Sequence, residues 1–198
     1  MHGMKPKYHT LNELIGMIEE PNGSICRGML DENQVLFTAA RGSKHNHQAW
    51  RGGYLDHITE IMNIAVILYT PLNEARPLPF SLSDSLLVLY LHDLEKPWKY
   101  ITKEDGSLEI NPLLADKAAQ VGPFVEQKIR EYGFVLTEDL WNGIKYVEGE
   151  KSDYSGKRRT QTPLAAFAHL CDNWSARGWF DFPAESEDPW PGAERSKQ

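Results

Sequence analysis

Cysteine is scarce in this chain, and long apolar runs are absent from it. The two cysteines, Cys26 and Cys171, do not suggest a disulfide framework. Cys171 stands in an apolar stretch, where a buried free thiol is the expected state. The longest apolar runs fall well short of the ~18 residues that a membrane span requires, and residues 1–7 contain no apolar stretch typical of a signal peptide. We therefore expect a cytoplasmic protein without a membrane partner.

Positive charge is in deficit. The chain has 21 Lys and Arg residues against 28 Asp and Glu residues, which gives a formal net charge of -7. This balance argues against extended duplex nucleic acid as a partner, because proteins that bind it present a broad basic surface. Cations nevertheless group in residues 41–51 and 157–159, and either group could form a local basic pocket.

Internal repeats and low-complexity segments are also absent. The 198 residues are 41% hydrophobic and 25% charged, which is ordinary for a globular domain with a substantial core. We expect one domain over residues 1–180, with its core at about 36–178, and an irregular tail rich in proline and acidic residues at 181–198. The composition does not predict an oligomeric state.

Helical periodicity dominates the chain. Apolar spacing predicts helices at residues 10–20, 31–40, 54–69, 81–96, 112–132, 137–149 and 162–177. The composition predicts loops at 21–30, 41–53 and 149–160, and a small hairpin at 100–111 that turns at Asp105-Gly106. Pro71 is expected to interrupt the chain after one helix and Pro97 to end another, while Gly122-Pro123 could break a third. We predict an all-α fold, a helical bundle with one small β-hairpin.

Four potential metal ligands fall in or next to these helices: His57, the pair His92-Asp93, and Asp172. Both aspartates stand in apolar stretches, where a carboxylate is costly to bury unless it is paired or bound to a cation. Imidazole nitrogens suit a borderline divalent metal, carboxylates add negative charge, and four ligands leave positions open for water and a substrate oxygen. The simpler reading is a hydrogen-bonded core histidine at 57 and an aspartate paired with a helix end at 93.

Three segments resemble the HD-domain metal-dependent phosphohydrolases. They read AARGSKHNHQAWRGGYLDH at 39–57, LHDLEK at 91–96 and HLCD at 169–172. The first is most similar to the HD domains of certain bacterial 3′-to-5′ exoribonucleases and to small phage and bacterial HD proteins. The resemblance implies an all-α HD bundle in which His57, His92, Asp93 and Asp172 hold one divalent ion (Mn, Co, Ni, Fe, Zn or Mg). It also implies that a metal-activated water hydrolyses a phosphate ester, with Asp93 orienting that water.

Lys96 follows Asp93 by about one helical turn. There it could hold a substrate phosphate or stabilise developing charge, or it could only complement a helix dipole. Small deoxynucleotidases of the family have glutamate at this position, so the lysine departs from them. The sequence has no histidine between residues 94 and 168, which favours one ion and counts against the di-iron HD oxygenases. Glu148 or Glu150 could support a weak second ion, although both could equally be exposed.

Other cations and aromatic residues are candidates for substrate contact, because arginine and aromatic planes stack on bases and cations hold phosphate. These candidates are Lys44, His45, His47, Arg51, Trp98 and Arg158. Each could instead be a packed or solvated side chain. His169 precedes Asp172 by three residues, hence on the same helical face, and could either hydrogen-bond a ligand or pack in the core.

The sequence as a whole predicts a hydrolase that acts on a nucleotide or short oligonucleotide phosphoester, with Asp93 and Lys96 as catalytic residues. The basic loops also fit a nuclease-like module that processes nucleic acid. A third possibility is a nucleotide sensor that keeps the metal pocket without turnover.

Overall fold

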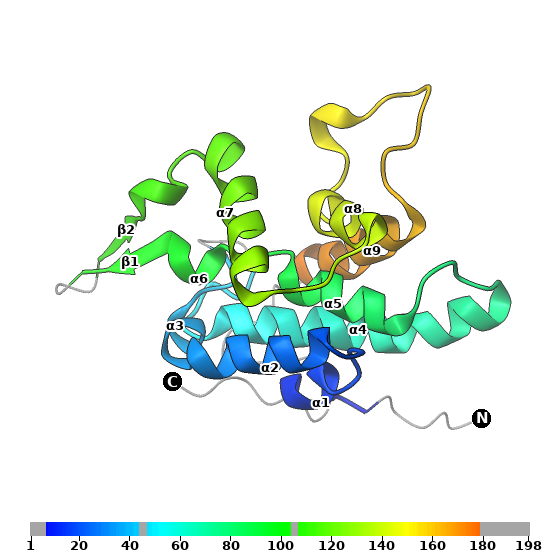
Figure 1. Ribbon diagram of the computed structural model, residues 1–198, viewed down its shortest axis with the longest axis horizontal. Helices are drawn as coiled ribbons and strands as arrows, with labels where there is room; N and C mark the ends of the chain where they lie inside the picture. The colour runs from blue at the N-terminus through cyan, green and yellow to red at the C-terminus, as the bar shows by residue number, and fades with distance from the viewer. Residues whose placement is uncertain (1–6, 44–46, 104–106, 179–198) are drawn as a thin grey trace.

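A computed structural model describes residues 7–43, 47–103 and 107–178 (Figure 1). The expected tail at 181–198, the residues Lys44 and His45, and the Asp105-Gly106 turn lie outside these ranges. In chain order the elements are α1 (Leu11–Ile15), α2 (Asn22–Glu32), α3 (Gln34–Ala39), α4 (Gly53–Ala75), α5 (Leu82–Leu91), α6 (Lys96–Lys99), β1 (Tyr100–Thr102), β2 (Leu108–Ile110), the 3-10 turn η1 (Pro112–Leu114), α7 (Lys117–Tyr132), α8 (Glu138–Tyr146), the 3-10 turn η2 (Lys151–Asp153) and α9 (Pro163–Arg177).

Over the described residues the fold is all-α apart from one antiparallel hairpin, as predicted. β1 and β2 pair with Ile101 opposite Glu109. Thr10, Thr137 and Thr162 are N-caps, whose side chains accept hydrogen bonds from the first turns of α1, α8 and α9. Within the described ranges, no helix combines the length and the apolarity that crossing a membrane demands.

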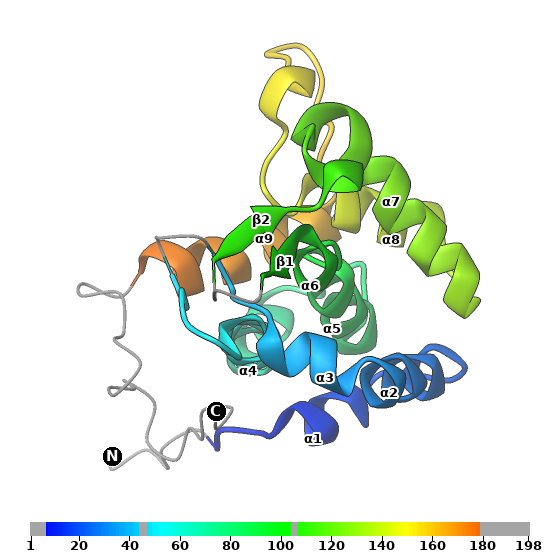
Figure 2. The same cartoon turned by 90° about the vertical axis from the view of Figure 1, so that its left-hand side faces the viewer.

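Helices α4 and α5 run through the middle of the structure (Figures 1 and 2). α4 packs against α1, α3, α5 and α9, and α8 packs against α5 and α9. Nearly all residues of α4 from Tyr54 to Ala65 are buried, and so are those of α5 from Ser85 to Leu91. The polar residues that these two elements carry are therefore held inside the core.

The predictions for Pro71 and for Gly122-Pro123 were wrong. α4 continues through Pro71 to Ala75, and α7 continues through Pro123. A proline inside a helix removes one backbone hydrogen bond, and the unpaired carbonyl is expensive only where water cannot reach it. Both prolines are exposed, so water can solvate the carbonyl that each leaves without a donor.

α5 ends earlier than the periodicity predicts. Its last residue is Leu91, His92 is its C-cap, and residues 92–95 form a turn. Pro97 does not end this helix but lies in the first turn of the next one, α6, where a proline needs no N–H partner. His92 and Asp93 therefore lie in a turn between two helices, not in the last turns of one.

The loop predicted at 21–30 was also wrong, because α2 covers this segment. Gly23, Cys26 and Met29 recur at a spacing of three and are buried along one side of the helix. Gly28 faces open space, since a Cβ there would meet nothing within 4 Å. Burial of the apolar stripe thus outweighs the low helix propensity of two glycines. The helix expected at 31–40 is correspondingly split, and α3 begins at Gln34.

Candidate metal centre

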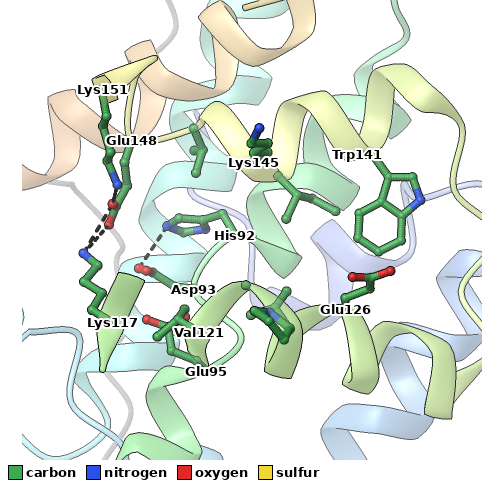
Figure 3. Close-up of a pocket in the computed structure, with 15 residues that line it drawn as sticks. His92, Asp93, Glu95, Lys117, Val121, Glu126, Trp141, Lys145, Glu148 and Lys151 are labelled. Carbon is green, nitrogen blue, oxygen red and sulfur yellow. Dashed lines mark hydrogen bonds and ion pairs between the residues drawn. The ribbon is translucent and has the colours of Figure 1, made fainter. Parts of the chain in front are cut away.

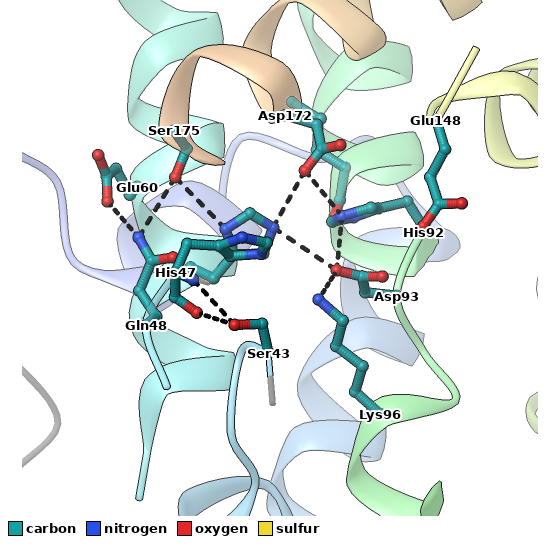
Figure 4. Close-up of polar contacts among 12 residues, drawn as sticks. Ser43, His47, Gln48, Glu60, His92, Asp93, Lys96, Glu148, Asp172 and Ser175 are labelled. Carbon is teal, nitrogen blue, oxygen red and sulfur yellow. Dashed lines mark hydrogen bonds and ion pairs between the residues drawn. The ribbon is translucent and has the colours of Figure 1, made fainter. Parts of the chain in front are cut away.

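Side chains from three parts of the fold meet at one buried point. His57 comes from α4, and His92 and Asp93 come from the turn after α5; one ligand atom of each lies within 4.8 Å of the others. Asp172 comes from α9, and its Oδ1 lies 3.2 Å from His57 Nε2 and 3.6 Å from His92 Nε2 (Figure 4). Only 0% and 1% of the two histidine side chains are exposed, against 8% for Asp93 and 16% for Asp172.

The donor set fits a cation. Both histidine Nε2 atoms are buried, and neither forms a hydrogen bond with any described residue. His92 Nδ1 lies 2.7 Å from the Leu89 carbonyl oxygen, which only accepts, so the proton of a neutral ring is on Nδ1 and a lone pair is on Nε2. That lone pair faces Asp93 Oδ2 at 3.0 Å. A lone pair and a carboxylate oxygen repel each other unless a proton or a metal ion lies between them. The group could therefore hold one metal ion.

The charges of the centre depend on one another. Burial opposes protonation of His92, but the carboxylates of Asp93 and Asp172 outweigh it and raise the pKa of His92 well above its ordinary value. Burial likewise favours the neutral acids, but the neighbouring histidines, and Lys96 in the case of Asp93, hold the pKa of both aspartates below the usual range. The same carboxylates that raise the pKa of His92 would also attract a cation at this point.

His57 is oriented by a buried polar chain. Its Nδ1 lies 3.3 Å from Ser175 Oγ, and Gln48 Nε2 donates to the same Oγ at 3.3 Å and to Glu60 Oε2 at 2.7 Å (Figure 4). Ser175 Oγ has two lone pairs, so it can accept from both Gln48 and His57 Nδ1–H and leave the His57 Nε2 lone pair directed at the centre. The sequence reasoning missed these residues. Glu60 and Ser175 each follow a ligand by three residues on the same helix, which was a usable signal, but Gln48 in its loop gave none.

The described residues of the loop before α4 approach this group of hydrogen-bonded side chains closely. A Cβ on Gly53 would lie 1.9 Å from the Gln48 carbonyl oxygen, so this close approach requires glycine. Gly52 has φ 82°, in the region that favours glycine. The His47 ring packs against His57 in a tilted arrangement, with 4.9 Å between centroids. Burial lowers the pKa of His47 to about 4, with a further contribution from His57, so the ring is neutral near pH 7.

Lys96 adjoins the centre. Its Nζ lies 2.5 Å from Asp93 Oδ2, and 16% of its side chain is exposed (Figure 4). Burial opposes its charge, but the Asp93 carboxylate outweighs burial and raises the pKa of Lys96. The dipole alternative stays open, because α6 is a single turn of four residues and Lys96 belongs to its last turn as well as its first.

One cavity is lined by residues of the turn at 92–95 and another by residues of α6, which follows it. Cavity 1, of about 540 Å³, opens on His92 and Asp93 between α7 and α8 (Figure 3). Its lining includes Glu95, a buried carboxylate that the sequence reasoning also missed. Cavity 2, of about 650 Å³, lies beside α3, α6 and β1. It is lined by Leu36, Ala39, Ala40, Arg41, Arg51, Lys96, Pro97, Trp98, Tyr100, Ile101 and Asn111.

The residues predicted to contact the substrate lie in different parts of the structure. Arg51 and Trp98 lie together in cavity 2, and His47 lies against His57. Arg158 is exposed, pairs through its backbone with Ser155 and is not among the residues that line either cavity. His169 Nδ1 lies 2.5 Å from the Val147 carbonyl oxygen, so it ties α9 to the end of α8.

Glu148 and Glu150 also have partners in the described structure. The Glu148 carboxylate contacts Lys117 and Lys151. Glu150 Oε1 accepts from the backbone N–H groups of Thr160 and Gln161. Any second ion would have to compete with these contacts.

Comparisons of the chain with protein-family models, with curated proteins and with solved structures found no match. The resemblance to HD-domain phosphohydrolases rests on three sequence segments and stays a prediction. The geometry by itself supports a coarser statement, which is that a buried His57, His92 and Asp93 group could hold one metal ion.

Proposed function

We propose that the protein is a metal-dependent phosphohydrolase of the HD type, acting on a nucleotide or short oligonucleotide phosphoester. One observation carries the proposal: two buried imidazole Nε2 atoms without hydrogen bonds face the carboxylates of Asp93 and Asp172, and Lys96 stands beside them. The order of these residues in the sequence and their resemblance to HD proteins add support.

In this proposal His57, His92, Asp93 and Asp172 hold the ion. A bound divalent ion supplies Lewis-acid polarisation of a phosphoryl oxygen and lowers the pKa of a coordinated water. The chain's own residues supply the rest. Lys96 keeps a positive charge next to Asp93, where it can neutralise a phosphoryl oxygen. Ser175 and Gln48 hold the His57 ring in place, and cavity 1 gives a substrate access to His92 and Asp93.

The direct test is hydrolysis of bis(4-nitrophenyl) phosphate, followed by a nucleotide panel, with Mn, Co, Ni, Zn and Mg supplied in turn to chelator-treated protein. We expect turnover that requires metal and that Asp93→Asn abolishes. Asp139→Asn is the matched control, because Asp139 is an exposed aspartate in the first turn of α8, and it should keep full turnover. Metal binding without turnover on any substrate would favour the nucleotide-sensor alternative.

A further inference from the structure

Cavity 2 has an unbalanced charge. The described residues that line it include three cationic side chains, Arg41, Arg51 and Lys96, of which Lys96 is paired with Asp93, and they include no carboxylate. In a chain with a net charge of -7, a concave surface that collects cations without acids needs an explanation. Such a cavity attracts an anion by its local field.

The two arginines are available for a ligand. Arg51 forms no hydrogen bond or ion pair within the described part of the chain. Among the described residues, the Arg41 side chain donates only to the Ala49 carbonyl oxygen, at 3.3 Å through Nη1, and its other N–H groups have no partner there. A guanidinium presents donors in a planar fork that matches a phosphate better than an ammonium does.

The wall beside them is aromatic and held in place. The Trp98 ring lies 5.6 Å from Phe37 in an edge-on contact and 5.8 Å from Phe124, and Lys128 Nζ lies 5.2 Å from its centroid. Tyr100 also lines the cavity. A cationic cavity with a fixed aromatic wall suits a phosphate attached to a sugar and base better than it suits a small inorganic anion.

Cavity 2 adjoins the metal centre through one residue. Lys96 lines cavity 2, while its Nζ contacts the Asp93 carboxylate at 2.5 Å. α3 and α6, which contribute to its walls, contact each other at the same end of the structure (Figure 1). An anion in cavity 2 could therefore approach the centre through Lys96.

Cavity 1 does not offer the same chemistry. Glu95, Glu126 and Glu148 line it, and two of its lysines, Lys117 and Lys151, are already paired with Glu148 (Figure 3). Its apolar residues include Trp141 and Ile144. This cavity favours the uncharged part of a ligand over a second phosphate.

We propose that cavity 2 binds a second phosphate of the substrate, one that is not hydrolysed, between Arg41 and Arg51. The substrate is then a short oligonucleotide with a terminal phosphate rather than a mononucleotide. The inference rests on the proposed function for the ester that reacts. Binding of the second phosphate does not itself require the metal, so the two can be tested apart.

The test measures binding, not turnover. Chelator-treated full-length protein is titrated in a calorimeter with two thymidine dinucleotides, one with a 5′-phosphate and one without. We expect the wild type to bind the phosphorylated form about tenfold more tightly or better, which is the effect of a charge-assisted hydrogen bond to phosphate. Arg51→Gln and Arg41→Gln should each remove most of this preference. Arg51→Lys keeps the charge but loses the fork, so it should retain only part of the preference.

Arg76→Gln is the matched control, because Arg76 is an exposed arginine that caps the far end of α4, and it should leave the preference intact. Equal affinity of the wild type for the two dinucleotides, or no measurable binding of either, would overturn the inference. So would a preference that survives both cavity substitutions, or one that Arg76→Gln reduces equally. If the protein prefers the phosphorylated dinucleotide but shows no metal-dependent hydrolysis, the proposed function is refuted while the anion site is supported.

Discussion

Replacing Asp172 by asparagine removes one negative charge from the metal centre and keeps the shape of the side chain. Asp172 Oδ1 lies 3.2 Å from His57 Nε2 and 3.6 Å from His92 Nε2, so it faces the same point as both rings. A charge-assisted contact contributes about 1.5–3 kcal/mol, and about 1.4 kcal/mol corresponds to a tenfold change in Kd. We therefore expect metal affinity to fall by at least about tenfold to a hundredfold. Activity should return only in part at high metal concentration.

The same substitution should have little effect on the stability of metal-free protein. The Asp172 carboxylate attracts a protonated His92, and such a pair at about 4 Å contributes about 4 kcal/mol at an effective dielectric constant of ~20. Desolvation of a buried carboxylate costs several kcal/mol and offsets this attraction. We expect a net change within about 1 kcal/mol, or roughly 2–4 °C in Tm.

Two assays separate these effects. Titration with Mn²⁺ measures metal affinity, and thermal melting with and without chelator measures stability. Wild-type metal affinity in the asparagine variant would show that Asp172 is not a ligand. A large loss of Tm in chelator would instead show that the carboxylate serves an ion pair within the protein.

Three further predictions concern other parts of the centre. Lys96→Ala should retain metal but lower turnover by ~10²-fold or more; unchanged turnover with a lower Tm would indicate a structural role for its contact with Asp93. Ser175→Ala should weaken metal binding about 10–100-fold through loss of the His57 Nδ1 partner, and Ser175→Thr should restore much of it; equal loss in both would point to packing alone. The Asp93 and Asp172 carboxylates outweigh burial and raise the pKa of His92 above the ~6.5 of the unfolded chain. In chelator, the stabilisation from protonated His92 is complete below pH ~6.5 and is lost as pH rises through the pKa of the folded protein, so Tm should fall over that range. Metal affinity should rise over the same range, because metal binding displaces the proton. A metal affinity that falls as pH rises would contradict this prediction.

The positions of the candidate ligands were readable from the sequence for a physical reason. Asp93 and Asp172 interrupt apolar stretches, and a lone buried carboxylate is expensive enough to signal a partner. The alternation of apolar residues along α4 and α5 likewise predicts which segments pass through the core. The structure places His57 and His92 beside these aspartates, whereas their function as metal ligands stays a prediction.

The residues at which helices begin and end were less predictable, because tertiary packing determines them. Apolar periodicity continues past Leu91, and nothing local indicates that the chain turns at His92 and begins a new helix at Lys96. In α2, a buried stripe overrides turn-forming residues that propensity alone assigns to a loop. Gln48 could not be predicted, because a loop residue has no periodic spacing that relates it to a ligand. Its contact with Ser175 also joins positions 127 residues apart.

The most direct test of the central claim is the metal content of the protein by elemental analysis. Wild-type protein would be stripped with chelator, reloaded with Mn²⁺ and freed of excess ion before measurement. The proposed metal centre should hold about one ion per chain, none in His92→Gln, and one in His169→Gln, because the hydrogen bond of His169 is with the Val147 carbonyl oxygen and not with a ligand. Wild-type protein that retains no ion after reloading with manganese, cobalt or nickel, or His92→Gln that retains as much as the wild type, would contradict it.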